Sequence, residues 1–170
     1  MKTVFFACAF GLLGAATFAQ DANSCADHHA AVNARGDMVM GFDHAKTTHH
    51  FILTPEGGVI SVSANDESDA ESRDAIRRHL AHVAKMFAAG DFEAPMLIHG
   101  QEPPGVPVMK AKKTGIRYTY QETSAGARVV ISTLDPKALA AIHDFLRFQI
   151  EDHRTGDPVD VRPERQPAKD

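Results

Sequence analysis

The densest group of side chains that could perform chemistry lies in residues 38–51, MVMGFDHAKTTHHF. This stretch holds three histidines, His44, His49 and His50, together with Asp43 and two methionines. Neutral imidazole is the commonest metal ligand, and a methionine thioether selects soft ions such as Cu(I). The composition therefore predicts a site for copper or zinc at this point of the chain.

A second group of ligand-type residues lies on a predicted helix that begins near Ser68 and stops at Gly90, where glycine can end a helix. His79, His82 and Met86 are spaced three and four residues apart on this helix. Side chains at that spacing can meet on one side of a helix. This side of the helix is a candidate edge of the same site.

The first hairpin leads directly into this helix, and a short connection keeps consecutive elements adjacent. We therefore expect one of the histidines at 49 and 50, with His44 and Asp43, to form a site that a helix histidine completes. Met86 or Met40 nearby would favour copper over zinc. The predicted metal ligands are His44, His49, His50, His79, His82 and Met86. A third place with candidate ligands is His99 with Met96, in a proline-rich segment.

Side chains alternate along a strand, so His49 would share a face with Phe51 and Leu53, while His50 points to the other face. Only one of the two histidines can then point into a given site. A protonated imidazole cannot ligate, so metal binding should weaken as the pH falls through about 6.5. His143 and His153 are expected to be core or helix-end histidines.

Hydrophobic periodicity predicts an α+β fold, with an antiparallel sheet of about five or six strands and two helices packed on one face. The helices are expected from residue 68 to 89 and from 135 to 154, each with one apolar stripe. No internal repeat is visible. The strands are expected at 38–42, 49–54, 59–64, 96–99, 106–111, 116–123 and 128–134, some of them brief.

The ends of the chain predict its compartment. Residues 1–19 have one cation, a short apolar run and small residues before a cleavage position at Ala19, as in a secretory signal peptide. We expect a flexible arm over 20–37, one α+β domain over 38–154 and a disordered tail over 155–170. The protein would be periplasmic or secreted, with no transmembrane segment, and the lone mature cysteine, Cys25, could form no internal disulfide.

Composition also limits the function classes. The formal net charge is −4 with no cluster of lysine or arginine, which argues against nucleic-acid binding. There is no His-Glu-x-x-His, paired Cys-x-x-Cys, Gly-x-Ser-x-Gly or phosphate-loop motif. Besides a metal-binding domain, two alternatives remain: an interaction or ligand-binding module with structural histidines, and a metal- or histidine-dependent enzyme. Histidines that converge on folding would favour metal binding or catalysis, and dispersed ones would favour the module.

Several short motifs resemble a small family of exported bacterial proteins without an assigned activity, some of whose members are labelled aspartate carbamoyltransferase. The resemblance covers most of residues 38–158 and implies the domain boundaries but no catalytic residue. The chain has no Ser-Thr-Arg-Thr loop for carbamoyl phosphate and is too short for two α/β domains. The motifs are Met-Gly-Phe at 40–42, Thr-His-His-Phe at 48–51, Gly-Gly-Val-Ile at 57–60, Phe-Leu-Arg-Phe-Gln-Ile at 145–150 and His-Arg-Thr-Gly-Asp-Pro at 153–158.

Overall fold

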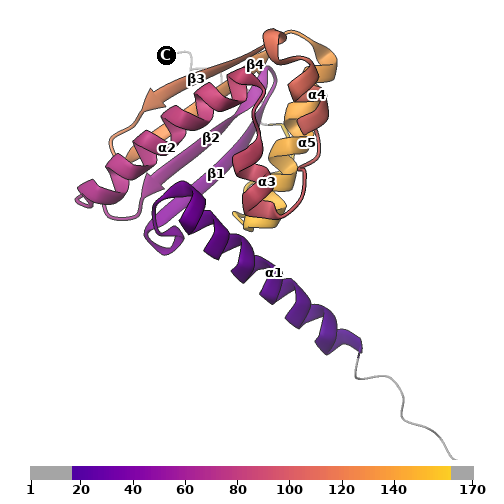
Figure 1. The fold of residues 1–170 in the computed structure, drawn as a ribbon. Helices are drawn as coiled ribbons and strands as arrows, with labels where there is room; N and C mark the ends of the chain where they lie inside the picture. The colour runs from indigo at the N-terminus through magenta and orange to yellow at the C-terminus, as the bar shows by residue number, and fades with distance from the viewer. Residues whose placement is uncertain (1–16, 162–170) are drawn as a thin grey trace, which may run out of the picture.

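The computed structural model describes residues 17–161 and shows an α+β fold built on one antiparallel sheet (Figure 1). The sheet has four strands in the order β1-β2-β4-β3. The strands are β1 (Thr47–Thr54), β2 (Gly57–Ala64), β3 (Ile116–Glu122) and β4 (Gly126–Thr133). The helices are α1 (Thr17–Met40), α2 (Ala70–Ala89), α3 (Glu93–His99), α4 (Val106–Ala111) and α5 (Pro136–His153), with short 3-10 turns at His44–Lys46 and Lys113–Gly115.

The predicted fold class and the antiparallel sheet are confirmed, whereas the finer prediction of five or six strands and two helices is wrong. Among the described residues there are four strands and five α-helices. None of these helices is both long enough and apolar enough to cross a bilayer. The predicted signal peptide lies mostly outside the described residues, which begin at position 17.

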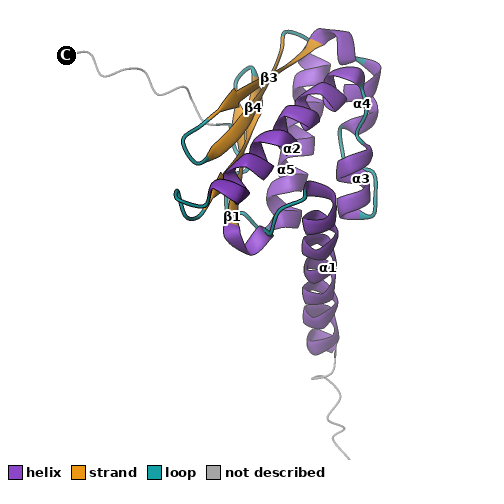
Figure 2. Cartoon of the chain, turned by 60° about the vertical axis from the view of Figure 1, so that its left-hand side comes forward, coloured by secondary structure: helices purple, strands orange, loops and turns teal. Residues whose placement is uncertain are grey.

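The same hairpin-and-helix unit occurs twice, as β1-β2-α2 and as β3-β4-α5, a repeat that the sequence did not reveal. The two units join through antiparallel pairing of β2 with β4, in which Gly57 lies opposite Ser132 and Ser63 opposite Gly126. Both helices lie on one face of the sheet (Figure 2). α2 packs mainly on β3 and β4, whereas α5 packs mainly on β1 and β2. Each helix therefore covers strands of the other unit.

Local sequence signals explain why α2 and α5 form where they do. Asp69 caps α2 by accepting a hydrogen bond from the backbone N–H of Ser72, and Asp135 caps α5 with Pro136 in the first turn. Gly90 ends α2 in the left-handed conformation. Both predicted helices are thus present, with their starts within two residues of the expected positions.

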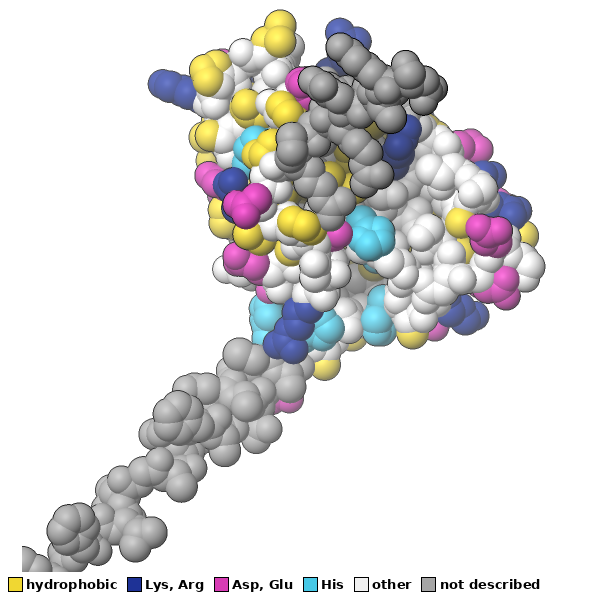
Figure 3. All heavy atoms as spheres, turned by 180° about the vertical axis from the view of Figure 1, so that it is seen from behind, with side chains coloured by type: hydrophobic (Ala, Val, Ile, Leu, Met, Phe, Trp, Pro, Cys, Tyr) yellow, Lys and Arg dark blue, Asp and Glu magenta, His cyan; other side chains and the backbone are white. Residues whose placement is uncertain are grey.

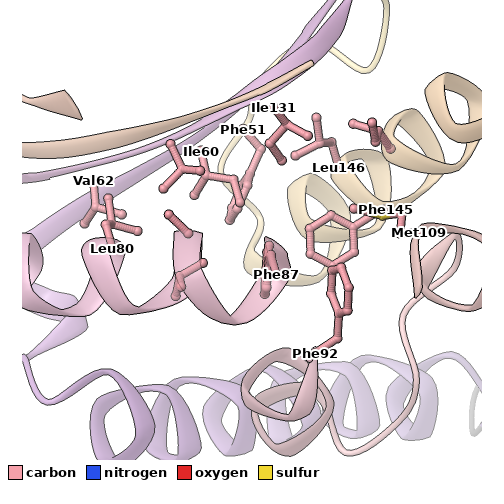
Figure 4. Close-up of a cluster of buried hydrophobic side chains, with 14 of the residues drawn as sticks. Phe51, Ile60, Val62, Leu80, Phe87, Phe92, Met109, Ile131, Phe145 and Leu146 are labelled. Atoms are coloured by element: carbon pink, nitrogen blue, oxygen red, sulfur yellow. The ribbon is translucent and has the colours of Figure 1, made fainter. Parts of the chain in front are cut away.

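Alternation along the strands places one apolar face of the sheet against these helices. Aromatic rings fill the space between the helices: Phe87 of α2 stacks on Phe92, with ring centroids 4.4 Å apart, and both meet Phe145 of α5 edge-on (Figure 4). Burial of each such side chain contributes about 1.5–3 kcal/mol. The sheet and helix residues of the core include Phe51, Leu53, Ile60, Val62, Leu80, Val129, Ile131, Ile142 and Leu146.

Residues 20–37, predicted as a flexible arm, belong to helix α1, as does most of the strand expected at 38–42. The second half of α1 packs against α3 and α5, and its first half extends away from the domain (Figure 1). Val32 is fully buried, and Arg35 Nε donates a 2.7 Å hydrogen bond to the carbonyl of Ile98. These contacts come from distant segments, so the composition of the arm could not indicate them.

The brief strands expected at 96–99 and 106–111 are also wrong, because these segments form most of α3 and all of α4. Pro95 and Pro107 lie in the first turns of these helices, where a missing N–H costs nothing. Short apolar segments of this length suit a strand and a helix turn equally well. Packing of α3 on α1, and of α4 on α5, decides for the helix.

The tail predicted to be disordered from residue 155 is docked over its first residues. Asp157 accepts a 2.9 Å hydrogen bond from the backbone N–H of Phe51, a 3.0 Å hydrogen bond from His50 Nδ1 and a 2.8 Å hydrogen bond from Thr155. Burial alone would raise the pKa of Asp157, but these hydrogen bonds hold it below its usual value. The segment therefore covers part of the outer edge of β1.

A glycine substitution tests the packing of α4 on α5. Gly105 has φ +81°, and a Cβ at this position would collide with the backbone carbonyl of Ala141 in α5. We expect Gly105→Ala to lower the free energy of unfolding by about 2 kcal/mol or more, measured by urea denaturation. Gly41→Ala, at φ +76° with nothing within 4 Å of a Cβ, is the matched control, because it has the same backbone strain without the collision. Equal stability of the two variants would contradict this packing.

Candidate functional site

Five elements bring ligand-type side chains to one pocket, called here the inner pocket. Met40 comes from the end of α1, His49 from β1, His79 from α2, His99 from the end of α3 and His153 from the end of α5. Apolar side chains of the core form the rest of its wall, together with Gln149 of α5. Histidines separated by as many as 104 positions in the chain thus converge in the folded protein.

The histidine rings of the inner pocket and the neighbouring ring of Phe42 form a continuous chain of contacts. His49 and His153 stack in parallel, with centroids 5.9 Å apart and an interplanar angle of 1°. His99 meets His153 edge-on at 4.9 Å. At the other end, Phe42 stacks on His49 at 5.9 Å and meets His79 edge-on at 5.7 Å. The four imidazoles therefore line one pocket, but their nitrogen atoms do not converge on a single ion position.

His99 is held from behind by a hydrogen-bonded carboxylate. Its side chain has no exposed surface, its Nδ1 lies 2.5 Å from Asp152 Oδ2, and its Nε2 lies 2.9 Å from Gln149 Oε1. The other oxygen of Asp152 lies 2.7 Å from His28 Nε2 on α1. Burial raises the pKa of Asp152, but the hydrogen bonds from the two histidines outweigh it and leave the pKa lowered. Asp152 therefore ties α5 to both α1 and α3.

Three imidazoles of the inner pocket are neutral at pH 7. Burial, reinforced by neighbouring histidines, lowers the pKa of His49 and of His79 to about 4 and that of His153 to about 3. A neutral imidazole keeps one nitrogen lone pair for a ligand. Protons would compete for these nitrogens nearer pH 4 than the value of about 6.5 expected for unperturbed histidines.

Two buried polar atoms on residues of the inner pocket have no hydrogen-bond partner. They are Nε2 of His49 and Nε2 of Gln149. A buried polar group without a partner costs about 1–3 kcal/mol, so native proteins leave few of them. Such atoms at a pocket point to a polar or metal ligand.

The predicted ligands are divided by the structure. His49 and His79 line the inner pocket, whereas His50 points to the other face of the sheet and pairs with Asp157. His82 and Met86 line a separate groove between α2 and α3. The structure therefore brings together two of the six residues named from the sequence.

His44 lies outside the inner pocket, in an adjoining outer cleft. Met40, His49 and His153 line both the inner pocket and this cleft. His44 Nδ1 lies 2.9 Å from Asp37 and 3.9 Å from Asp43, and ligand atoms of these three residues lie within 4.8 Å of one another. Seen from behind, histidines gather where α1 joins the domain (Figure 3).

His99 and His153 line the inner pocket but are not among the six predicted metal ligands, although His99 was named with Met96 as a further candidate. His153 was expected to be a core or helix-end histidine, an expectation that His143 meets by binding the carbonyl of Thr54 at 2.9 Å. A signal for His153 was present in the sequence of α5. Gln149 and His153, four residues apart, lie on the apolar stripe of this helix. Polar residues inside an apolar stripe indicate a polar pocket beneath it.

No family model, no curated protein and no solved structure matches this chain. The resemblance to exported bacterial proteins therefore stays a prediction. The chemistry of the inner pocket has to be argued from its own geometry.

The lowered histidine pKa values predict loss of stability in mild acid. As the pH falls from about 6.5 toward 4, the unfolded chain takes up protons on His49, His79 and His153 while the folded chain does not. Stability present above pH 6.5 should therefore decline through this window. Urea denaturation at several pH values between 7.5 and 4.5 would measure it.

The variant His153→Phe should reduce this slope, because phenylalanine keeps the ring stack and does not titrate. The charged or titratable groups that act on His153 are His99, His49, Asp152 and His29. His82→Phe, at an exposed position, serves as the control and should keep the wild-type slope. A free energy of unfolding that stays constant from pH 7 to 4.5 would contradict the prediction.

Proposed function

We propose that this protein is an exported metal-binding domain that holds one copper or zinc ion in the inner pocket. His49, His79 and His153 would be the nitrogen ligands, with Met40 as a sulfur ligand. The observation that supports this most directly is the buried, unpartnered Nε2 of His49 in a pocket lined by neutral imidazoles. Export rests on the predicted signal peptide.

The chemistry of the pocket suits this assignment. Neutral imidazole is the form that binds Cu and Zn, and coordination would give His49 Nε2 the partner that it lacks. The low pKa values mean that no proton has to be displaced at pH 7. The cost of burying unprotonated imidazoles is then offset when the ion binds.

Binding requires some movement of the rings. Nitrogen ligands lie about 2.0–2.1 Å from zinc, and among the described residues only the group of Asp37, Asp43 and His44 has three ligand atoms within 4.8 Å of one another. Parallel stacking of His49 and His153, 5.9 Å apart, keeps their nitrogens from facing one point. Rotation of these rings about their side-chain bonds would turn the nitrogens toward a shared ion.

His99 would act as a positioning residue behind the ligands. Metal-binding histidines are commonly oriented by a carboxylate, and His99 has this arrangement through Asp152. Because Gln149 occupies its Nε2, His99 instead supports the ring of His153 edge-on. The carboxylate fixes the position of a wall of the pocket.

Two alternatives fit the geometry less well. An interaction module with structural histidines would leave the imidazoles dispersed, whereas four of them line one pocket. An enzyme using the His99 and Asp152 pair for acid–base chemistry would need a free nitrogen on His99, but both nitrogens are engaged. Metal binding uses the nitrogen that is unpartnered.

Metal analysis of the protein purified without a polyhistidine tag would test the proposal. We expect one equivalent of copper or zinc to bind the wild-type protein. The double variant His49→Phe, His153→Phe should lose at least about a hundredfold in affinity, because two nitrogen ligands are removed while the aromatic stack is kept. Circular dichroism would verify that the variant is folded.

The matched control uses two positions on the same helix. His79→Phe should weaken binding, whereas His82→Phe, three residues away in a different groove, should not. Absence of stoichiometric metal binding in the wild-type protein, or equal losses in the two single variants, would reject the inner pocket as the site.

A further inference from the structure

The side chains that line the inner pocket carry no formal charge of an acidic or basic residue. No Asp, Glu, Lys or Arg of the described residues lines it. Its polar members are imidazoles, one amide and one thioether, and the rest are apolar side chains such as Phe51, Leu80 and Phe145. An ion bound here would meet no formally charged ligand.

Resting on the proposed function, we infer that the inner pocket selects Cu(I) over Zn(II). The cost of moving an ion from water into an apolar medium rises with the square of its charge, so a dication costs about four times as much as a monocation of similar size. Carboxylate or thiolate ligands would offset that cost for a dication. The inner pocket offers neither.

One carboxylate, Asp152, lies behind the wall of the inner pocket. Asp152 contacts His99 on the nitrogen that faces away from Gln149, and its second oxygen is taken by His28. It lies behind the wall and does not reach the pocket itself. One carboxylate behind the wall carries a single negative charge, so a dication would keep more uncompensated charge than a monocation in this apolar surrounding.

The types of ligand atoms in the inner pocket also favour Cu(I). Met40 lines the pocket beside His49 and His153, and a thioether is a soft ligand that favours Cu(I). Three imidazoles and one thioether form a neutral, partly soft ligand set, which suits Cu(I) better than Zn(II).

Oxygen ligands are kept apart from the pocket. Asp37 and Asp43 lie with His44 in the exposed group of the outer cleft, and Asp37 is already bonded to both the ring and the backbone N–H of His44. Hard divalent ions prefer such oxygen atoms. The carboxylates of Asp37 and Asp43 thus lie with His44 outside the inner pocket, whereas Met40 lines it.

Anaerobic titration of the untagged protein tests this inference. Cu(I) would be supplied against the chromophoric chelator bicinchoninate, and Zn(II) against a zinc indicator of known affinity. We expect one equivalent of Cu(I) bound at least about a hundredfold more tightly than Zn(II) at this site. Met40→Leu should weaken Cu(I) binding by about tenfold and leave Zn(II) binding nearly unchanged, since only the soft ligand is removed.

His153→Phe identifies which bound metal belongs to the inner pocket, because the group of Asp37, Asp43 and His44 in the outer cleft does not include His153. Zn(II) bound as tightly as Cu(I) and lost in His153→Phe would overturn the selectivity while leaving the proposed metal-binding function intact. Failure of both ions to bind at one equivalent would overturn both. Retention of Cu(I) affinity in Met40→Leu and in His153→Phe would also refute the assignment to this pocket.

Discussion

The structure depends on the antiparallel pairing of β2 with β4. This ladder joins two hairpins into one sheet and sets both following helices on the same face. The helices cross over: α2 lies mainly on the strands of the second unit, and α5 mainly on those of the first. Because each helix packs mainly on strands of the other unit, the two units form one core together.

The crossed packing also creates the inner pocket. Because α5 covers β1, its last residue, His153, lies directly over His49, although 104 positions separate them. The aromatic side chains of Phe87, Phe92 and Phe145 fill the middle of the space between the helices (Figure 4). Next to these rings the imidazoles line the inner pocket, and residues of α1 and α3 form its remaining walls.

Burial of these imidazoles works against stability and in favour of ligand binding. Removing them from water lowers their pKa values and leaves His49 Nε2 without a partner, both of which cost free energy in the folded protein. Buried polar groups without a partner are typical of binding sites, where a ligand replaces the hydrogen bonds to water that were lost on folding. The hydrogen bonds of Asp152 to His28 and His99 offset part of that cost and join three helices around the pocket.

The sequence by itself determined the features that depend on residues near one another in the chain, which are the strands, the long helices and the faces of their side chains. Alternation predicted both hairpins and the opposite directions of His49 and His50, and Asp135 with Pro136, like the apolar stripe of α2, predicted the two long helices. The density of histidines also drew attention to His49 and His79. Each of these signals lies within a few residues, because strand and helix periods are local properties.

Only the tertiary structure decided which histidines meet. The first hairpin and its following helix contribute His49 and His79 to the pocket, and α5, which packs mainly on β1 and β2, adds His153. Long-range packing also explains why the segment predicted as an arm is helix α1 and why two segments predicted as strands are helices α3 and α4. His99 and His153 joined the pocket through these contacts, and no local pattern indicates which distant helix will cover a given strand.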